Sequence, residues 1–315
     1  MSSQSLIANQ HMISVVIPIF NEELLISELH KRILGSIPAI TEDFEILFVD
    51  DGSSDNSLLM LFELNRKDKR FKIIQLSKNF GHQQAYSAGL SVAKGEYIVM
   101  MDGDLQDPPE LIIEMHAKLI SEQSDIVYAK RLDKKETFIR KFLMNRFHAI
   151  FRNILKTPNA DNVGNFAIFT KEVKQAFMLY SEKSRYLPGI RFNLGYKQDF
   201  VLYSRDARYA GDAKMTLSKL FTLALDAIFS FSNLPLRFFL ILGIGGIAIS
   251  ILGFIYILIG KILGIAPYGW SSTLFFMFLF NSIQITFLGI IGEYVYRIYK
   301  EVQNRPLFII KKVIE

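Results

Sequence analysis

The chain has 315 residues, half of them hydrophobic, with a formal net charge of +5 and no cysteine. The lack of cysteine excludes disulfides, zinc–thiolate sites and a cysteine nucleophile. The positive charge favours partners with phosphates or an anionic membrane surface, and no aromatic-and-basic motif indicates nucleic acid.

Short apolar runs alternate with helical patterns in the first two thirds of the chain. We predict strands over 14–19, 44–49, 71–76, 96–101 and 125–128, and helices over 22–35, 55–67, 82–93 and 109–121. This alternation predicts a parallel sheet covered by helices, in a domain that spans residues 1–212. Such sheets bind ligands beyond the carboxyl ends of their strands.

Polar side chains follow four of the predicted strands. They are Asn21 and Glu22, Asp50 and Asp51, Ser77 to Asn79, and Asp102, Asp104 and Gln106. The last group supplies the oxygen ligands that a hard divalent cation prefers, with room for substrate phosphates. A solvated turn would explain any one group, but four at one sheet edge favour a site. Because the chain has neither a G-x-G-x-x-G fingerprint nor a P-loop, a metal is expected to neutralise the phosphates.

Two uncharged stretches occur within residues 234–296. As helices, 238–260 and 271–292 would each span roughly 30–35 Å, enough to cross a bilayer core. We predict membrane-spanning helices over about 237–260 and 271–293; a buried hairpin is the alternative. Basic residues flank the pair, while only Lys261 lies between them. The catalytic domain, the tail 297–315 and both termini are therefore expected in the cytoplasm, at an inner or plasma membrane.

The region 213–233 carries apolar residues at helical spacing. We predict an amphipathic helix on the membrane surface, or alternatively a helix packed on the globular domain. The tail at 306–310 is strand-like and suited to pair with a sheet edge, of this chain or of a neighbouring subunit. Glycines in the predicted spans suit close helix contacts, so a homo-oligomer is plausible.

Several motifs make the chain recognisable. VVIPIFNE at 15–22, VDDGSSD at 49–55 and MDGDLQDPPE at 101–110 occur in that order and resemble the family 2 glycosyltransferases of GT-A fold. NFGHQ at 79–83, RYLPG at 185–189, AGDAK at 210–214 and GEY at 292–294 are similar to segments of the polyprenyl-phosphate glycosyltransferases. That group includes dolichol-phosphate mannose synthases and bactoprenol glucosyltransferases. The likeness runs over nearly the whole chain.

The resemblance implies roles for individual residues. Those implied to bind nucleotide are Pro18, Phe20, Asn21, Glu22, Asp50, Asp51, Ser77, Asp102 and Gly103. Asp102, Asp104 and Gln106 look like ligands of Mg²⁺ or Mn²⁺. The implied catalytic set is Asp104, Arg131, Arg140 and Asn165, in which the two arginines resemble phosphate-binding residues. Arg205, Arg208 and Lys214 look placed for a lipid phosphate. A solvated helix face explains most other basic residues of 130–156.

The expected reaction is inverting transfer of a sugar from a nucleotide sugar, such as UDP-glucose, to a polyprenyl phosphate such as undecaprenyl phosphate. A phosphate monoester is largely dianionic at pH 7 and needs little help from a base. Asn165 stands where relatives usually carry an acidic residue, so a base role is not expected there. A separate flippase is expected to move the product across the membrane.

Two alternatives stay open. A processive polysaccharide synthase usually carries a Gln-x-x-Arg-Trp motif, whereas the only tryptophan here is Trp270, between the predicted spans. A non-catalytic membrane protein that binds nucleotide or lipid is the other alternative. Asn165 favours it, and the Asp102, Asp104 and Gln106 set opposes it.

Overall fold

The computed structural model of the protein describes residues 11–132, 163–180, 182, 187–204, scattered positions between 241 and 263, and 269–315. The chain forms two compact units, Met1–Lys214 with Pro306–Glu315, and Met215–Arg305. Four predicted site residues lie outside the described residues: Arg140, Arg205, Arg208 and Lys214. The predicted amphipathic helix and much of the first predicted span also lie outside them.

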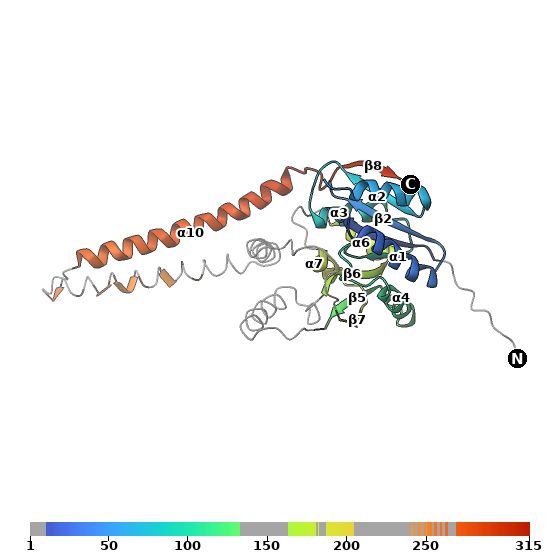
Figure 1. Cartoon of the computed structure of the whole chain (residues 1–315). Coiled ribbons are helices and arrows are strands. Elements are labelled where there is room, and N and C mark those ends of the chain that lie inside the picture. Colours follow the sequence, from blue (N-terminus) through green and yellow to red (C-terminus); the bar gives the residue numbers. More distant parts are fainter. Residues whose placement is uncertain are drawn as a thin grey trace. The chain divides into compact units, whose positions relative to one another are not determined.

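An eight-stranded mixed sheet forms the centre of the first unit, in the order β7-β5-β6-β4-β1-β2-β3-β8 (Figure 1). Its strands are β1 (Ile13–Ile19), β2 (Phe44–Asp50), β3 (Phe71–Leu76), β4 (Tyr97–Met100), β5 (Ile126–Arg131), β6 (Val163–Thr170), β7 (Gln198–Tyr203) and β8 (Ile310–Ile314). β3, β2, β1 and β4 run parallel to one another, and β6 pairs antiparallel with both β4 and β5. The carboxyl ends of β1 to β4 therefore meet at one edge.

Helices cover both faces of this sheet. The core of one face includes residues of α1 (Ile26–Ser36), the 3-10 helix η1 (Ile37–Ala39), α2 (Ser57–Lys67) and α4 (Leu111–Ser121). The other face packs against α3 (His82–Val92), α6 (Lys171–Leu179) and α7 (Leu187–Asn193). Successive strand residues point to opposite faces, so Val15 and Ile17 enter the first core and Val16 the second. Strands buried on both faces are apolar throughout, as β1 is.

The predicted mixed, mainly parallel α/β domain is confirmed. All five predicted strands and all four predicted helices are present within a few residues of their expected ends. The sequence did not predict β6, β7, α6 or α7. β6 carries Asn165, and its antiparallel direction brings that residue toward the carboxyl end of β4, since Met100 pairs with Ala167.

The C-terminal tail returns to this sheet. β8 pairs antiparallel with β3 of the same chain, with Ile314 opposite Ile73, and the backbone N–H of Ser77 donates to the carbonyl of Ile309 (3.0 Å). The strand begins at Ile310, at the end of the expected strand-like stretch. The tail therefore closes the β3 edge of its own sheet.

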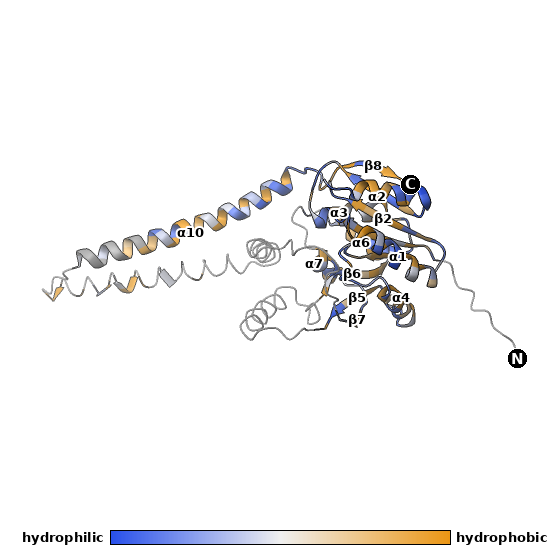
Figure 2. Cartoon of the chain, in the orientation of Figure 1, coloured by the Kyte–Doolittle hydropathy of each residue, from blue (hydrophilic) through white to orange (hydrophobic). Residues whose placement is uncertain are grey.

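The second unit contains α10 (Trp270–Val302), a helix of 33 residues. Orange apolar segments occur along it, and hydrophilic residues are more frequent toward its C-terminal end (Figure 2). Leu279, Leu288 and Val295 are exposed. In the part of the chain that the structure describes, we find no helix with the length and apolar character needed to cross a bilayer. The predicted pair of spans is thus not confirmed and remains a prediction.

Candidate active site

The loop after β1 is tied to the loop after β2. Asn21 adopts a left-handed backbone conformation (φ +54°), and its Oδ1 accepts the backbone N–H of Ser54 (2.8 Å). The backbone N–H groups of Asn21 and Glu22 donate to the hydroxyls of Ser53 (3.1 Å) and Ser57 (2.8 Å). Two of the predicted nucleotide-binding segments are therefore held together by their own polar groups.

Two further nucleotide-binding candidates, Pro18 and Phe20, lie at the end of β1. Pro18 is buried in β1, while Phe20 lies beyond the strand end with its side chain partly exposed. An exposed aromatic ring beside polar loops is available to pack on a flat ligand such as a base. Phe20 is therefore better placed than Pro18 to touch a nucleotide through its side chain.

Asp50 is the last residue of β2 and Asp51 follows it, and both side chains are buried. Asp50 Oδ1 accepts the backbone N–H of Ser53 (3.1 Å). The two oxygens of Asp51 accept the N–H groups of Phe80 (2.7 Å) and Gly81 (2.9 Å), which precede α3. Burial raises the pKa of both carboxyls, because these bonds to neutral donors only partly offset desolvation.

The approach of this loop to the loop after β3 requires glycine. Gly52 has φ +76°, and a Cβ there would lie 2.8 Å from the backbone nitrogen of Asn79. A side chain at residue 52 would therefore force the two backbones apart. Ser77, the remaining candidate on this side, is exposed at the start of the β3 loop.

Asp102, the first carboxylate after β4, is held by two side chains of α3. The Tyr86 hydroxyl donates to Asp102 Oδ1 (2.6 Å), and His82 Nε2 lies 3.2 Å from the same oxygen. Burial opposes ionisation of Asp102, but the bonds from His82 and Tyr86 and the charges of His82 and Arg131 outweigh it and lower its pKa. Burial raises the pKa of Tyr86 well above its usual value, so the Tyr86 hydroxyl stays protonated and donates to Asp102.

The rest of this loop is shaped by close packing and an unusual backbone. Gly103 packs against the end of β1, where a Cβ would lie 3.0 Å from Ile19 Cδ1 and 3.1 Å from the Pro18 carbonyl oxygen. Leu105 is buried with φ +57°, a rare conformation for a bulky residue and one that is common at functional sites. Between them, Asp104 Oδ1 accepts the backbone N–H of Gln106 (3.1 Å).

The candidate metal ligands come from one loop. In the described ranges, no group of three or more His, Asp or Glu side chains converges to hold a metal ion. Asp102, Asp104 and Gln106 offer two carboxylates and an amide, and Mg²⁺ commonly takes one or two carboxylates together with substrate phosphates. This oxygen donor set therefore fits a Mg²⁺ or Mn²⁺ ion that binds together with a diphosphate.

Arg131 ends β5 beside this loop. Its Nε donates to the Tyr203 hydroxyl (3.1 Å), and one guanidinium nitrogen lies 3.8 Å from Asp107 Oδ1. Tyr203 in turn donates to the same Asp107 oxygen (2.6 Å). Burial lowers the pKa of Arg131, but Tyr203, Asp107 and the charge of Asp102 raise it overall. Arg131 is thus a fixed positive charge near Asp102.

Asn165 lies on β6, next to Gly164, whose added Cβ would approach Arg131 to 3.0 Å. Its backbone carbonyl accepts Arg191 (2.8 Å), and Arg191 also donates to the Gly164 carbonyl (2.8 Å). The buried Oδ1 of Asn165 has no hydrogen-bond partner among the residues that the structure describes. An unsatisfied buried acceptor of this kind points to a polar ligand or water at that position.

Sequence reasoning missed four residues of this region: Tyr86, Asp107, Arg191 and Tyr203. His82 and Tyr86 are four residues apart, the spacing that puts two side chains on one helix face, and this was the available signal. Arg191 is fully buried, and no sequence pattern singled it out from solvated arginines.

A mixed α/β sheet with acidic loops at its carboxyl edge defines the class of α/β enzymes that bind ligands at that edge. Within this class, the family model for glycosyl transferase family 2 matches residues 14–177. The chain belongs to this family and is a glycosyltransferase.

Three relatives align over nearly the full length. The uncharacterized glycosyltransferase YkcC of Bacillus subtilis is 40% identical, covering 95% of this chain and 93% of its own length. The prophage bactoprenol glucosyl transferase homolog of Escherichia coli is 34% identical, with 96% and 99% covered. The undecaprenyl-phosphate 4-deoxy-4-formamido-L-arabinose transferase of Proteus mirabilis is 30% identical, with 96% and 94% covered. The resemblance noted from the motifs is confirmed.

Proposed function

We propose that this glycosyltransferase transfers a sugar from a nucleotide sugar, UDP-linked ahead of GDP-linked, to a polyprenyl phosphate such as undecaprenyl phosphate, with inversion at the anomeric carbon. The observation that carries the proposal is the pair of acidic loops after β2 and β4, joined through α3, with Arg131 beside them. Full-length similarity to proteins named for bactoprenol and undecaprenyl-phosphate substrates supports the acceptor.

In this proposal the donor binds over the carboxyl edge. The loops at 20–22 and 50–52 would hold the nucleoside, and Asp102, Asp104 and Gln106 would hold a Mg²⁺ or Mn²⁺ ion near the diphosphate. When bound, such a metal stabilises negative charge on the leaving diphosphate. Arg131, fixed by Tyr203 and Asp107, adds a second positive charge for the same purpose.

The acceptor phosphate supplies its own nucleophile. A dianionic phosphate oxygen attacks the anomeric carbon, the bond from that carbon to the diphosphate oxygen breaks, and the nucleoside diphosphate leaves. Because the acceptor is already ionised at neutral pH, the neutral side chain of Asn165 is compatible with the reaction. Its unsatisfied Oδ1 suits a hydroxyl of the sugar.

We further propose that residues 234–296 anchor the enzyme in an inner or plasma membrane, with the sheet domain in the cytoplasm. A membrane anchor brings the domain to a lipid acceptor that cannot leave the bilayer. Arg205, Arg208 and Lys214 are then available for the lipid phosphate, and a separate flippase is needed to carry the product across.

The test is transfer from a panel of radiolabelled UDP- and GDP-sugars to undecaprenyl phosphate in detergent. Each donor is assayed with Mn²⁺ or with EDTA, for the wild type and for Asp104→Ala. A lipid-linked product that needs the metal and is lost in Asp104→Ala supports the proposal and names the sugar. No product from any donor, with nucleotide binding intact, favours a non-catalytic protein. A product containing many sugars favours a processive synthase.

A further inference from the structure

Helix α3 connects the two acidic loops of the site. The backbone N–H groups of Phe80 and Gly81, just before its first turn, bind the carboxylate of Asp51. One turn apart on the helix, His82 and Tyr86 both reach Asp102. Helix α3 and the residues just before it therefore tie the two carboxylates to each other.

The two contacts from α3 meet at one oxygen. The Tyr86 hydroxyl (2.6 Å) and His82 Nε2 (3.2 Å) both lie within bonding distance of Asp102 Oδ1. Their rings pack edge to face, with centroids 4.9 Å apart, which fixes the direction from which each reaches the carboxylate. With Oδ1 held from two sides, Oδ2 is the oxygen left to face a ligand.

We propose that Tyr86 is a positioning residue, assisted by His82, that fixes Asp102 so that Oδ2 is presented to the divalent metal and diphosphate. This inference rests on the proposed function. Residues that orient metal ligands through hydrogen bonds typically change metal affinity or activity by about 10-fold to 100-fold when they are removed.

The chain offers a matched control for the Tyr86 hydroxyl. Tyr86 and Tyr128 are both fully buried, and both pack in the same core on the α3 side of the sheet. Within the described part of the chain, however, the hydroxyl of Tyr128 has no hydrogen-bond partner. Tyr86→Phe and Tyr128→Phe therefore remove the same atom from similar surroundings, but only the first removes a bond to Asp102.

The experiment uses the full-length chain in detergent and measures Mn²⁺ binding by calorimetry in the presence of UDP. We expect Tyr86→Phe to weaken Mn²⁺ binding by about tenfold or more, with Tyr128→Phe equal to wild type. The concentration of Mn²⁺ that half-activates transfer should rise in parallel, while turnover at saturating Mn²⁺ changes less. A purely structural role would lower the melting temperature without this change in metal affinity.

A second variant covers the case in which His82 alone still holds Oδ1. Because both donors act on one oxygen, Tyr86→Phe with His82→Ala should weaken Mn²⁺ binding by more than the product of the single effects. The inference is overturned if both the single and the double variant bind Mn²⁺ as Tyr128→Phe does. Absence of metal-dependent UDP binding in the wild type would instead refute the proposed function.

Discussion

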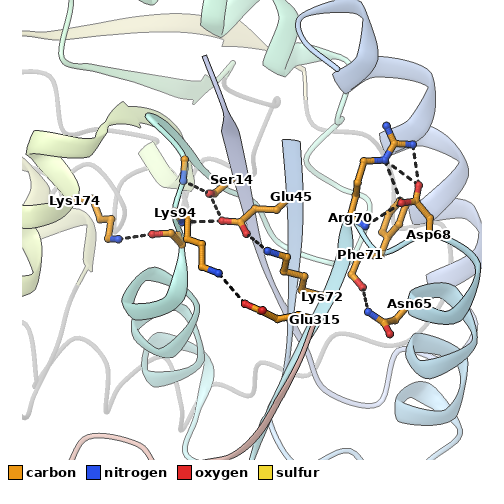
Figure 3. A network of polar contacts seen from close by, with 12 residues as sticks. Ser14, Glu45, Asn65, Asp68, Arg70, Phe71, Lys72, Lys94, Lys174 and Glu315 are labelled. Carbon is orange, nitrogen blue, oxygen red and sulfur yellow. Dashed lines mark hydrogen bonds and ion pairs between the residues drawn. The ribbon is translucent and has the colours of Figure 1, made fainter. Parts of the chain in front are cut away.

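Glu45 is a buried carboxylate in β2 whose replacement by a neutral amide should destabilise the fold. It is the second residue of β2 and is 1% exposed. Its Oε1 accepts the Ser14 hydroxyl (2.6 Å) and the backbone N–H of Lys94 (2.7 Å), and its Oε2 accepts Lys72 Nζ (2.8 Å). Figure 3 shows these groups converging on the carboxylate.

Glu45→Gln keeps the shape and one acceptor oxygen but turns an NH₂ group toward Lys72. The ammonium of Lys72, whose side chain is 16% exposed, then faces a donor in place of its carboxylate. Removing one partner of a buried ion pair costs about 3–5 kcal/mol. Because Lys72 retains some access to water, we expect the lower end, about 3 kcal/mol. For domains of 150–250 residues this lowers the melting temperature by roughly 6–12 °C.

The pH dependence gives an independent check. Burial opposes ionisation of Glu45, but Lys72, Ser14 and Lys94 outweigh it and lower its pKa. A carboxyl with a lowered pKa in the folded state stabilises the protein above its unfolded pKa, about 4.3, and loses this contribution as pH falls through the folded pKa. The difference between wild type and Glu45→Gln should therefore shrink on acidification.

Thermal melts followed by circular dichroism at pH 7 and pH 4 measure both effects. Lys94→Gln is the control, because it breaks the Lys94–Glu315 pair of the same network, where both side chains are more than half exposed. That variant should have the same melting temperature as the wild type. An equal melting temperature for Glu45→Gln at pH 7, or a deficit that persists unchanged at low pH, would refute the reasoning.

Three further predictions concern the site. Gly103→Ala should weaken UDP–Mn²⁺ binding by about tenfold or more in calorimetry, because the new Cβ would press against the Pro18 carbonyl oxygen. The control Gly35→Ala, whose Cβ would have no atom within 4 Å, should bind UDP and Mn²⁺ as the wild type does. In the transfer assay, Arg131→Lys should lower kcat/KM by about 10-fold to 100-fold, because lysine cannot reproduce the planar contacts to Tyr203 and Asp107. A kcat/KM near that of the wild type would exclude a role for the guanidinium. Asn165→Asp should change the transfer rate modestly, and a thousandfold change would mean that a base is needed there.

The sequence predicts the parallel half of the fold well. β1 to β4 are apolar runs followed by polar loops, and β1 with β2 and β2 with β3 pair in successive βαβ units, so periodicity and turn residues locate these strands. The antiparallel strands are different. β8 is separated from its partner β3 by more than 230 residues, and nothing in a local pattern specifies which edge it joins.

The candidate site divides in the same way. Asp50 and Asp51 lie at the end of β2, and Asp102 and Asp104 lie in the loop after β4, so the rule for carboxyl edges places them together. The residues that hold these carboxylates come from elsewhere: Tyr86 is an ordinary buried tyrosine in sequence terms, and only the packing of α3 reveals its partner. Sequence reasoning therefore finds the groups that face a ligand more readily than the groups that orient them.

The two ends of β2 carry buried carboxyls with opposite pKa shifts, and this contrast yields a last prediction. Glu45 has a cation beside it and its pKa is lowered, whereas Asp50 accepts bonds from neutral donors and burial raises its pKa. A raised pKa means that Asp50 contributes stability at low pH and loses it as pH rises through the folded value.

Asp50→Asn should therefore gain stability relative to wild type as pH rises, which is the opposite of the trend for Glu45→Gln. The same variant should bind UDP more weakly, because Asp50 stands in the loop proposed to hold the nucleoside. Melts across pH 4 to 8, with UDP titrations, test both expectations. Parallel pH trends for the two variants would contradict the argument. Opposite trends would mean that the ionised Glu45 at one end of β2 stabilises the fold, whereas the ionised Asp50 at the other end destabilises it and is kept for ligand binding.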